Sequence, residues 1–196
     1  MSKRTLTKEE IQEEYLVIKA AQKNRRRFGM LYERYFDEIF FFVLKRVDDQ
    51  EACGDVTSQV FYKAMTKLDK YQFRGVPFSA WLYRIAINEV NQHYRETNKQ
   101  RTISADSKDL TQIMEEVIED DDIEVHLQQL VDTFDYLSHE EVQMIELRFF
   151  EKLAFKEIAQ VYNITENNAK VKMYRLLDKM KKIMVGKKKV KVENNR

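Results

Sequence analysis

Apolar residues recur at steps of three and four along the first half of the chain, which is the spacing of helices that turn one face toward a core. Thr7 and Glu10 have the spacing of a capping box before the first of four apolar stripes. Pro77, the chain's only proline, precedes the fourth stripe. The four stripes are Ile11, Tyr15 and Ile18; Leu31, Tyr35, Ile39 and Phe42; Val56, Val60, Ala64 and Leu68; and Trp81, Ile85, Ala86 and Val90. The pattern predicts a compact helical domain over residues 1–97.

The helical periodicity is lost after His93, and residues 98–134 are polar and acidic. Between Asp106 and Glu124 there are nine acids and one base, Lys108. Because such a composition offers little apolar surface to bury, we interpret 98–134 as a flexible acidic linker, partly disordered, with helix in its second half. The linker separates two small domains.

Helical periodicity returns and predicts a second domain over residues 135–185. Ser138 and Glu141 have the spacing of another capping box. A short helix then ends near Asn163, a good residue for the left-handed conformation, and Thr165 is a good first cap for a longer helix. Two short helices joined by a tight turn are typical of a helix-turn-helix.

Composition favours an all-α fold. One proline and four glycines leave little turn chemistry for a sheet, and good helix formers are abundant. The N-terminus lacks the apolar core of a signal peptide and no segment approaches a membrane span, so we expect a cytoplasmic protein without membrane insertion. The net charge is only +1, but the charges are unevenly distributed and residues 186–196 form a basic tail. This tail is either a disordered solubilising segment or a segment that contacts phosphates.

No group of residues predicts catalysis. The three histidines, His93, His126 and His139, are isolated and lack the spacing of a metal site. Cys53, the single cysteine, has no activating base nearby in the sequence, so we interpret it as structural rather than nucleophilic. We expect no enzymatic activity, no metal and no cofactor.

The second helix of the predicted helix-turn-helix has a polar and basic face opposite its apolar stripe. This face consists of Asn167, Asn168, Lys170, Val171, Lys172, Tyr174 and Arg175. In a major groove the first residues of such a helix meet base edges, while lysines meet phosphates. Arg175 is suited to a guanine, and Asn167 or Asn168 to an adenine. We predict DNA binding here; the alternative is an ordinary solvated helix.

The segment "FRGVPFSAWLYRIAINEVNQHYR", residues 73–95, combines an apolar and a polar face. Trp81, Leu82 and Ile85 are expected in the core. A second set of aromatic, cationic and amide residues in and beside it consists of Tyr71, Phe73, Arg74, Phe78, Arg84, Asn88, Asn91, Gln92 and Arg95. Exposed aromatics beside cations and amides suit unpaired bases and their backbone. A surface satisfied within the protein is an equal alternative on the residues alone.

Four stretches, taken in order, resemble a known family. They are "LYERYFDEIFFFVLKRV", "DVTSQVFYKAM", "FRGVPFSAWLYRIAIN" and "LSHEEVQMIELRFFEKLAFKEIAQVYNITENNAKVKMYRLL". Together they look like regions 2 and 4 of a bacterial sigma-70 family sigma factor of the extracytoplasmic-function (ECF) group. The resemblance covers residues 13–97 and 135–184, and the linker between them fits the group's missing region 3.

The resemblance implies a factor that binds core RNA polymerase, recognises a promoter, opens its −10 element and directs transcription initiation. Asp55, Gln59 and Phe61 match the helix that docks on the β′ clamp helices. The stretch 71–78 matches the loop that captures a flipped −10 base. Arg84, Asn88, Asn91, Gln92 and Arg95 match the helix that reads the upstream part of that element. Lys170, Val171, Lys172, Tyr174 and Arg175 match the −35 reading helix, with Asn167 and Asn168 at its start and Asn168 nearer phosphate.

The implied partners are core polymerase through its β′ and β subunits, promoter DNA as duplex and as unpaired non-template strand, and an anti-sigma factor. Departures from the family pattern leave alternatives open. Ala52, Gly54 and Gln59 stand where acids are usual, and Val171 replaces a small polar residue. One alternative delegates promoter choice partly to another DNA-bound partner. The other is a helix-turn-helix repressor or activator acting without core polymerase.

Overall fold

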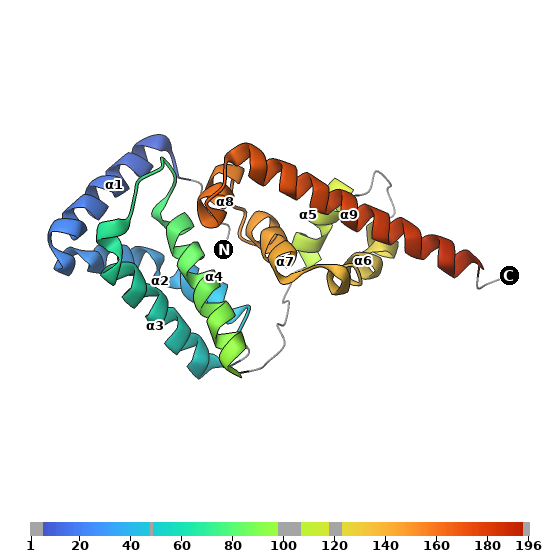
Figure 1. The fold of residues 1–196 in the computed structure, drawn as a ribbon, viewed down its shortest axis with the longest axis horizontal. Coiled ribbons are helices and arrows are strands. Elements are labelled where there is room, and N and C mark those ends of the chain that lie inside the picture. Colours follow the sequence, from blue (N-terminus) through green and yellow to red (C-terminus); the bar gives the residue numbers. More distant parts are fainter. Residues whose placement is uncertain (1–5, 48, 98–106, 118–122, 194–196) are drawn as a thin grey trace. The chain divides into compact units, whose positions relative to one another are not determined.

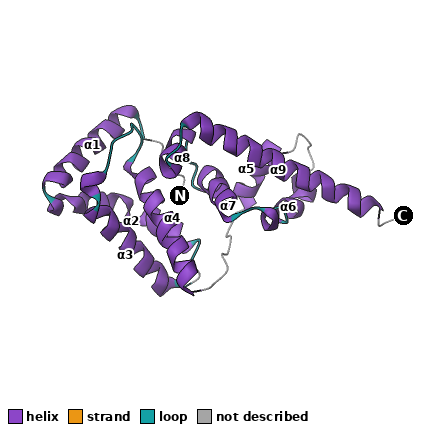
Figure 2. Ribbon diagram, in the orientation of Figure 1, coloured by secondary structure: helices purple, strands orange, loops and turns teal. Residues whose placement is uncertain are grey.

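The computed structural model describes residues 6–47, 49–97, 107–117 and 123–193 (Figure 1). All regular secondary structure in these ranges is helical, which confirms the predicted all-α fold (Figure 2). The described residues form two compact units. Unit 1 contains those up to residue 97 together with Gln160–Asn163, and unit 2 contains the rest.

Unit 1 is built from four α-helices and two short 3-10 helices. They are α1 (Lys8–Lys23), η1 (Arg25–Phe28), α2 (Gly29–Leu44), α3 (Gln50–Thr66), η2 (Leu68–Lys70) and α4 (Phe78–Thr97). Helices α2, α3 and α4 pack against one another, and α1 packs on α2 and on both 3-10 helices. The predicted capping box starts α1: Glu10 N donates to Thr7 Oγ1 at 3.2 Å, and Thr7 N donates to Glu10 Oε2 at 2.8 Å.

The apolar stripes predicted for the first domain form the core of unit 1. Every member of the second and third stripes is buried. Ile18, Ala86 and Val90 of the other two stripes are also buried, whereas Trp81 and Ile85 are half-exposed. The core therefore lies where the periodicity places it, and the start of α4 is rotated slightly from the expected orientation.

Unit 2 contains the remaining helices, except that the end of α8 from Gln160 onward is grouped with unit 1. They are α5 (Ser107–Val117), α6 (Ile123–Val131), η3 (Phe134–Tyr136), α7 (His139–Ile145), the π-helical turn η4 (Glu146–Phe150), α8 (Phe155–Tyr162) and α9 (Glu166–Glu193). The capping box of Ser138 and Glu141 starts α7 as predicted. Helix α9 packs against α5, α6 and α7.

Helix α6 lies in the second half of 98–134, where helix was expected, whereas α5 differs from the flexible segment expected before it. Helices α5 and α6 lie within that range and pack against each other and on α9. Ile113, Met114 and Val117 of α5 are buried, as is Leu130 of α6. These few apolar residues recur at helical spacing and form one apolar stripe. The average composition of the segment is dominated by its acids and does not show this stripe. Residues 98–106 and 118–122 lie outside the described ranges.

Of the two alternatives for the tail, the disordered one differs from the structure over most of the segment. Helix α9 continues through Glu193, so the backbone of the predicted tail is helical from 186 to that residue. Residues 194–196 lie outside the described part of the chain. No described helix is both long enough and apolar enough to cross a membrane.

Candidate nucleic-acid and polymerase interfaces

Helix α4 presents one polar face and one buried face. Arg84, Asn88, Gln92 and Arg95 are exposed at steps of four, four and three, so they form a single stripe along the helix. Asn91 is half-buried beside this stripe. The opposite face is formed by buried residues that include Leu82, Ala86 and Val90. No hydrogen bond or ion pair joins the side chain of Arg84 or Asn88 to another described residue, so both are available to a ligand.

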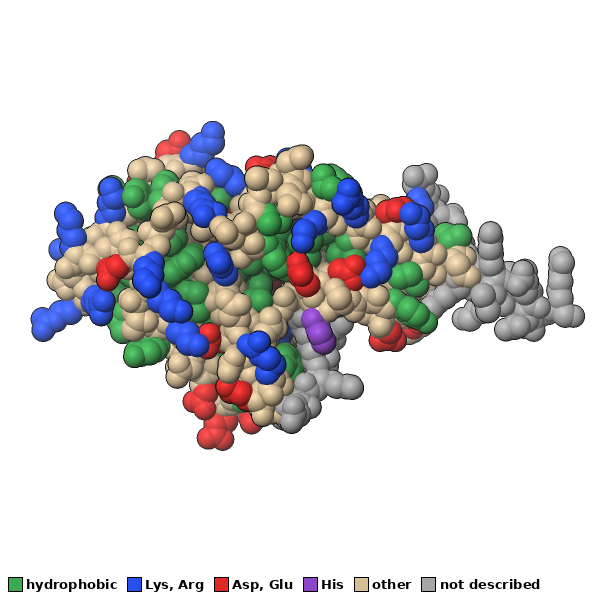
Figure 3. Space-filling model, in the orientation of Figure 1, with side chains coloured by type: hydrophobic (Ala, Val, Ile, Leu, Met, Phe, Trp, Pro, Cys, Tyr) green, Lys and Arg blue, Asp and Glu red, His purple; other side chains and the backbone are tan. Residues whose placement is uncertain are grey.

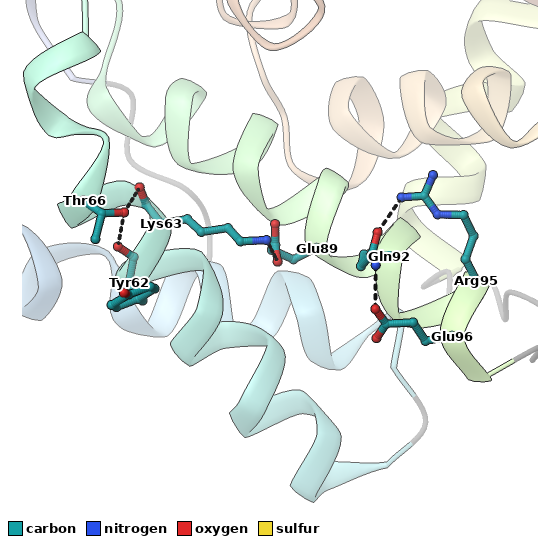
Figure 4. A network of polar contacts seen from close by, with 7 residues as sticks. All are labelled: Tyr62, Lys63, Thr66, Glu89, Gln92, Arg95 and Glu96. Atoms are coloured by element: carbon teal, nitrogen blue, oxygen red, sulfur yellow. Dashed lines mark hydrogen bonds and ion pairs between the residues drawn. The ribbon is translucent and has the colours of Figure 1, made fainter.

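Polar contacts organise the second half of this face (Figure 4). Arg95 Nη2 donates to Gln92 Oε1 at 2.8 Å, and Gln92 Nε2 donates to Glu96 Oε1 at 2.5 Å. On the side of the helix toward α3, Lys63 Nζ lies 2.6 Å from Glu89 Oε2. Because Glu89 is largely buried and paired, it adds little negative charge to the exposed stripe.

Two of the aromatic residues expected on this surface are buried instead. Phe78 is fully buried and Tyr71 is only 7% exposed, so the prediction that they offer free rings to bases is wrong. Tyr71, Phe78 and Trp81 pack as a triangle with ring centroids 5.2–5.4 Å apart. Burial raises the pKa of the Tyr71 phenol. Trp81, expected in the core, is the partly exposed member, because α4 begins at Phe78 and turns that residue inward.

The loop before α4 keeps one aromatic and one cation near the surface. Phe73 is half-buried and stacks on Tyr15 of α1, with ring centroids 4.3 Å apart and planes 12° from parallel. Arg74 is exposed. Gly75 has φ 66°, a conformation that favours glycine, and it turns the chain toward Pro77 and the start of α4.

A buried carboxylate holds the start of α4. Glu14 of α1 is 1% exposed, and its Oε2 accepts a 2.7 Å hydrogen bond from Phe78 N. Tyr35 Oη donates to Glu14 Oε1, and Arg34 Nε lies 3.6 Å from the same oxygen. Burial, reinforced by the Glu14 charge, raises the pKa of Tyr35. Glu14 is not among the residues predicted above, although an acid inside the stripe of Ile11 and Ile18 is a signal in the sequence.

The α3 residues expected to dock on polymerase do not all face solvent. Asp55 and Gln59 are exposed and one turn apart. Phe61 is only 4% exposed, because it points toward α2 and packs on Tyr32 and Phe36 at ring-centroid distances of 4.8 and 6.2 Å. Phe61 is therefore a core residue in this structure, and Asp55 and Gln59 are the exposed members of the predicted docking set.

The helix-turn-helix has the predicted turn. Asn163 has φ 55°, the left-handed conformation expected after α8. Ile164 N donates to Ala159 O at 3.0 Å, and Asn168 N donates to the Thr165 side chain at 3.2 Å, which caps α9. Local sequence alone was enough to predict this turn.

The predicted reading face of α9 is exposed. Asn167, Asn168, Val171, Lys172, Tyr174 and Arg175 are exposed, and Lys170 is half-exposed. Ala169, Met173, Leu176 and Met180 are buried on the other side. The face is therefore anchored by the apolar stripe that the sequence predicts.

Ion pairs and rings fix the orientation of this face. Lys170 Nζ lies 2.8 Å from Glu166 Oε1, and its hydrogen bond and charge hold the pKa of Glu166 below its usual value. Lys172 Nζ lies 3.3 Å from Glu140 on α7. The Tyr174 ring lies 6.2 Å from that of Phe155, and the Arg148 guanidinium lies 4.7 Å above Phe155.

A second ion pair joins α9 to α7 two turns further along α9. Lys179 Nζ lies 2.8 Å from Glu141 Oε2. Burial tends to raise the pKa of Glu141, but the hydrogen bonds from Lys179 and Ser138 outweigh it and hold that pKa below its ordinary value. Glu141 therefore serves both the cap of α7 and the attachment of α9.

The described residues offer no arrangement for metal or thiol chemistry. They contain no group of three or more His, Cys, Asp or Glu that could hold a metal ion. Cys53 is buried, and burial raises the pKa of its thiol, which disfavours the reactive thiolate. Its Sγ lies 3.7 Å from Phe40 O, as a packed structural residue would.

Two family models match the chain: Sigma-70 region 2 over residues 31–100, and Sigma-70, region 4 over residues 134–182. Together they cover more than half of its 196 residues. The chain belongs to the sigma-70 family. The polar face of α4 lies within region 2, and the helix-turn-helix lies within region 4.

The chain is similar to a named ECF sigma factor and to another sigma factor. The ECF RNA polymerase sigma factor BldN of Streptomyces coelicolor is 26% identical over 170 residues, which are 86% of this chain and 64% of BldN. The RNA polymerase sigma-H factor of Pseudomonas aeruginosa is 28% identical over 187 residues, covering 88% of this chain and 94% of that factor. Sigma factors are initiation factors rather than enzymes, and they act with RNA polymerase at promoter DNA.

The fold is shared with a solved structure. CnrH, solved in complex with the cytosolic domain of CnrY, superposes with a TM-score of 0.54 at 20% identity. The match covers 87% of this chain and 96% of that one.

Proposed function

We propose that this ECF sigma factor opens its promoters with the exposed stripe of α4. The observation that supports the proposal is the pair Arg84 and Asn88, exposed one turn apart and without partners among the described residues. Cations and amides in a row suit the backbone and the edges of unpaired non-template bases in the −10 element. Gln92 and Arg95 extend the stripe, and Asn91 borders it.

In the loop before α4, only the rings that remain accessible would capture a base. Phe73 and Trp81 are partly exposed and Arg74 is exposed, whereas Tyr71 and Phe78 are buried and pack against Trp81. Each base stacked on an aromatic ring contributes about 1–3 kcal/mol, which offsets part of the cost of separating the strands. A flipped −10 base would therefore meet the outer edge of this aromatic cluster.

Polymerase and −35 contacts are assigned to two other exposed surfaces. Asp55 and Gln59 of α3 would meet the β′ clamp helices of core polymerase, with further contacts to β. The α9 face from Asn167 to Arg175 would read the −35 duplex. Exposed Val171 is suited to a thymine methyl group and Arg175 to a guanine.

The proposal that the protein is an ECF sigma factor also implies where it acts and how it is regulated. An ECF factor of this kind would act in the bacterial cytoplasm, where polymerase and promoters are. An anti-sigma factor would keep it inactive by covering the surfaces that meet polymerase. The departure at Val171 keeps open a second DNA-bound protein that helps to select promoters, and the departure at Gln59 affects the polymerase contact.

Run-off transcription with sequencing tests the function. The purified chain and bacterial core polymerase are incubated with fragmented DNA from the source genome. We expect discrete new start sites that share upstream −10 and −35 sequences and that are absent with core polymerase alone. New starts that appear only with a second protein would support shared promoter selection. Failure of the chain to co-elute with core polymerase would contradict the proposal.

A further inference from the structure

One lysine of unit 2 has a strained backbone conformation. Lys152 lies between η4 and α8 and has φ 55°, in the left-handed region. Side chains disfavour this region, and glycine is the usual residue at such a turn. Asn163 is the other non-glycine residue at positive φ in the described ranges, but asparagine tolerates this conformation better than lysine does. The lysine therefore calls for a reason other than the local fold.

The turn uses only the backbone of Lys152. Leu153 N donates to Leu147 O at 2.9 Å, which is the closing bond of a Schellman motif with Lys152 at its left-handed position. Leu153 is fully buried, and its carbonyl accepts a 3.2 Å hydrogen bond from Arg148 Nη1. The Lys152 side chain is exposed, and no hydrogen bond or ion pair joins it to another described residue. Glycine could therefore close the same turn.

Side-chain contacts connect this turn with the reading face of α9. The Arg148 guanidinium, which holds the Leu153 carbonyl, lies 4.7 Å from the centroid of the Phe155 ring. The Phe155 ring in turn lies 6.2 Å from that of Tyr174 on the reading face. In a helix-turn-helix the second helix enters the major groove while the first crosses the sugar-phosphate backbone. Because Lys152 directly precedes the first helix, α8, we expect it to lie nearer phosphates than base edges.

The charges around the turn suit an anion. Between residues 148 and 157 there are three bases and two acids. One of these acids, Glu157, accepts a 2.8 Å hydrogen bond from Ala154 N through its Oε2 and so caps the start of α8. Lys156, the next base after Lys152, is exposed. Lys and Arg side chains also lie along α9 on the face of unit 2 that is visible in Figure 3. A phosphate group is a fitting partner for the exposed Lys152 ammonium.

We propose that Lys152 binds a backbone phosphate at the edge of the −35 element, and that this contact is the reason for a lysine at the left-handed position. The inference rests on the proposed function, because it requires α9 to read the −35 duplex. A phosphate contact carries no base information, but it fixes the register and orientation of the reading helix in the groove. Lys152 is thus a positioning residue beside the base contacts assigned to Val171 and Arg175.

The test replaces Lys152 by glycine, which removes the charge and the backbone strain together. Affinity of holoenzyme for promoter DNA is measured between about 50 and about 200 mM salt. One duplex phosphate contact adds about 0.9 to the slope of log affinity against log salt, so Lys152→Gly is expected to be about 3.5-fold less sensitive over this range. The denaturation midpoint of the full chain is expected to rise, because glycine adopts positive φ without a clash. A residue with only a structural role would not combine greater stability with weaker DNA binding.

Two control variants separate the charge from the strain. Asn163→Gly relaxes the other positive φ of a non-glycine residue and removes no charge. Lys182→Ala removes a lysine whose side chain is 75% exposed and pairs with Asp178, two turns beyond Arg175 on α9. Both variants are expected to keep the salt dependence of wild type.

Uncharged phosphates locate the contact. Promoter duplexes carry a single methylphosphonate at successive positions around the −35 element. Wild-type holoenzyme is expected to lose affinity where Lys152 binds, whereas Lys152→Gly is expected to lose nothing further at that one position. Such non-additive losses show that the lysine and that phosphate interact.

The outcomes separate this inference from the proposed function. An unchanged salt dependence of Lys152→Gly, additive losses at every phosphate, or a lower denaturation midpoint than wild type would each overturn the inference. Weaker assembly of that variant with core polymerase would overturn it in favour of an acidic protein partner. If Arg175→Ala holoenzyme distinguishes the −35 element from a scrambled one as wild type does, the proposed −35 role of α9 is wrong. If Arg175→Ala loses this discrimination while Lys152→Gly behaves as wild type, only the role of Lys152 is wrong.

Discussion

Replacing Glu14 by alanine is expected to lower the free energy of unfolding by about 3–5 kcal/mol. The substitution leaves Phe78 N and Tyr35 Oη buried without their acceptor, and each buried unsatisfied donor costs about 1–3 kcal/mol. It also removes a negative charge from the N-terminus of α4, where the helix dipole favours one. Glu14 therefore ranks with the core side chains in its effect on unit 1.

Chemical denaturation of the full chain, followed by fluorescence of its single tryptophan, measures this effect. Glu13→Ala is the matched control, because Glu13 is exposed and its loss is expected to cost less than about 0.5 kcal/mol. Glu14→Gln keeps one acceptor oxygen, so its loss of unfolding free energy is expected to lie between those of Glu14→Ala and Glu13→Ala. Equal denaturation midpoints for Glu14→Ala and wild type would contradict the role of this carboxylate.

Phe78→Ala is expected to cost about 3–5 kcal/mol of stability, the range for removing a buried phenylalanine ring. The ring is fully buried and packs on Tyr35, Tyr71 and Trp81. Phe41→Ala, on a ring that is 56% exposed, is the control, expected to cost less than about 1 kcal/mol. Both are measured by denaturation of the full chain.

Phe78→Leu distinguishes a core role from base capture. Leucine keeps most of the apolar volume but offers no ring to a base, so holoenzyme with this variant is expected to open promoters as wild type does. A variant with near-wild-type stability that cannot open promoters would show that Phe78 contacts DNA. The buried position assigned to it would then be wrong for the promoter complex.

The helices and the turn of the helix-turn-helix could be predicted because their signals are local. The spacing of Leu31, Tyr35 and Ile39 fixes a buried face, and Asn163 before Thr165 fixes a turn. The exposed stripe of α4 followed from the same periodicity. The assignment of its exposed residues to DNA came from the family resemblance, because the residues alone left a satisfied surface equally open.

The predictions of burial and exposure that failed concern residues whose orientation depends on tertiary contacts. Whether Phe78 or Trp81 faces the core depends on where α4 starts, which is set by the loop and by Glu14 on a distant helix. Phe61 turns toward rings on α2 that lie about thirty residues earlier in the sequence. In α5 a narrow apolar stripe outweighs many acids, which composition does not reveal.

The most direct test of the −10 assignment compares promoter opening by wild-type and Asn88→Ala holoenzymes, measured by permanganate reactivity of unpaired thymines. Loss of a base contact is expected to lower opening about tenfold, with unchanged affinity for core polymerase. Gln112→Ala removes an exposed amide from α5 in unit 2 and is expected to behave as wild type. If Asn88→Ala opens promoters normally, or if it loses polymerase binding instead, the exposed stripe of α4 is not the −10 surface.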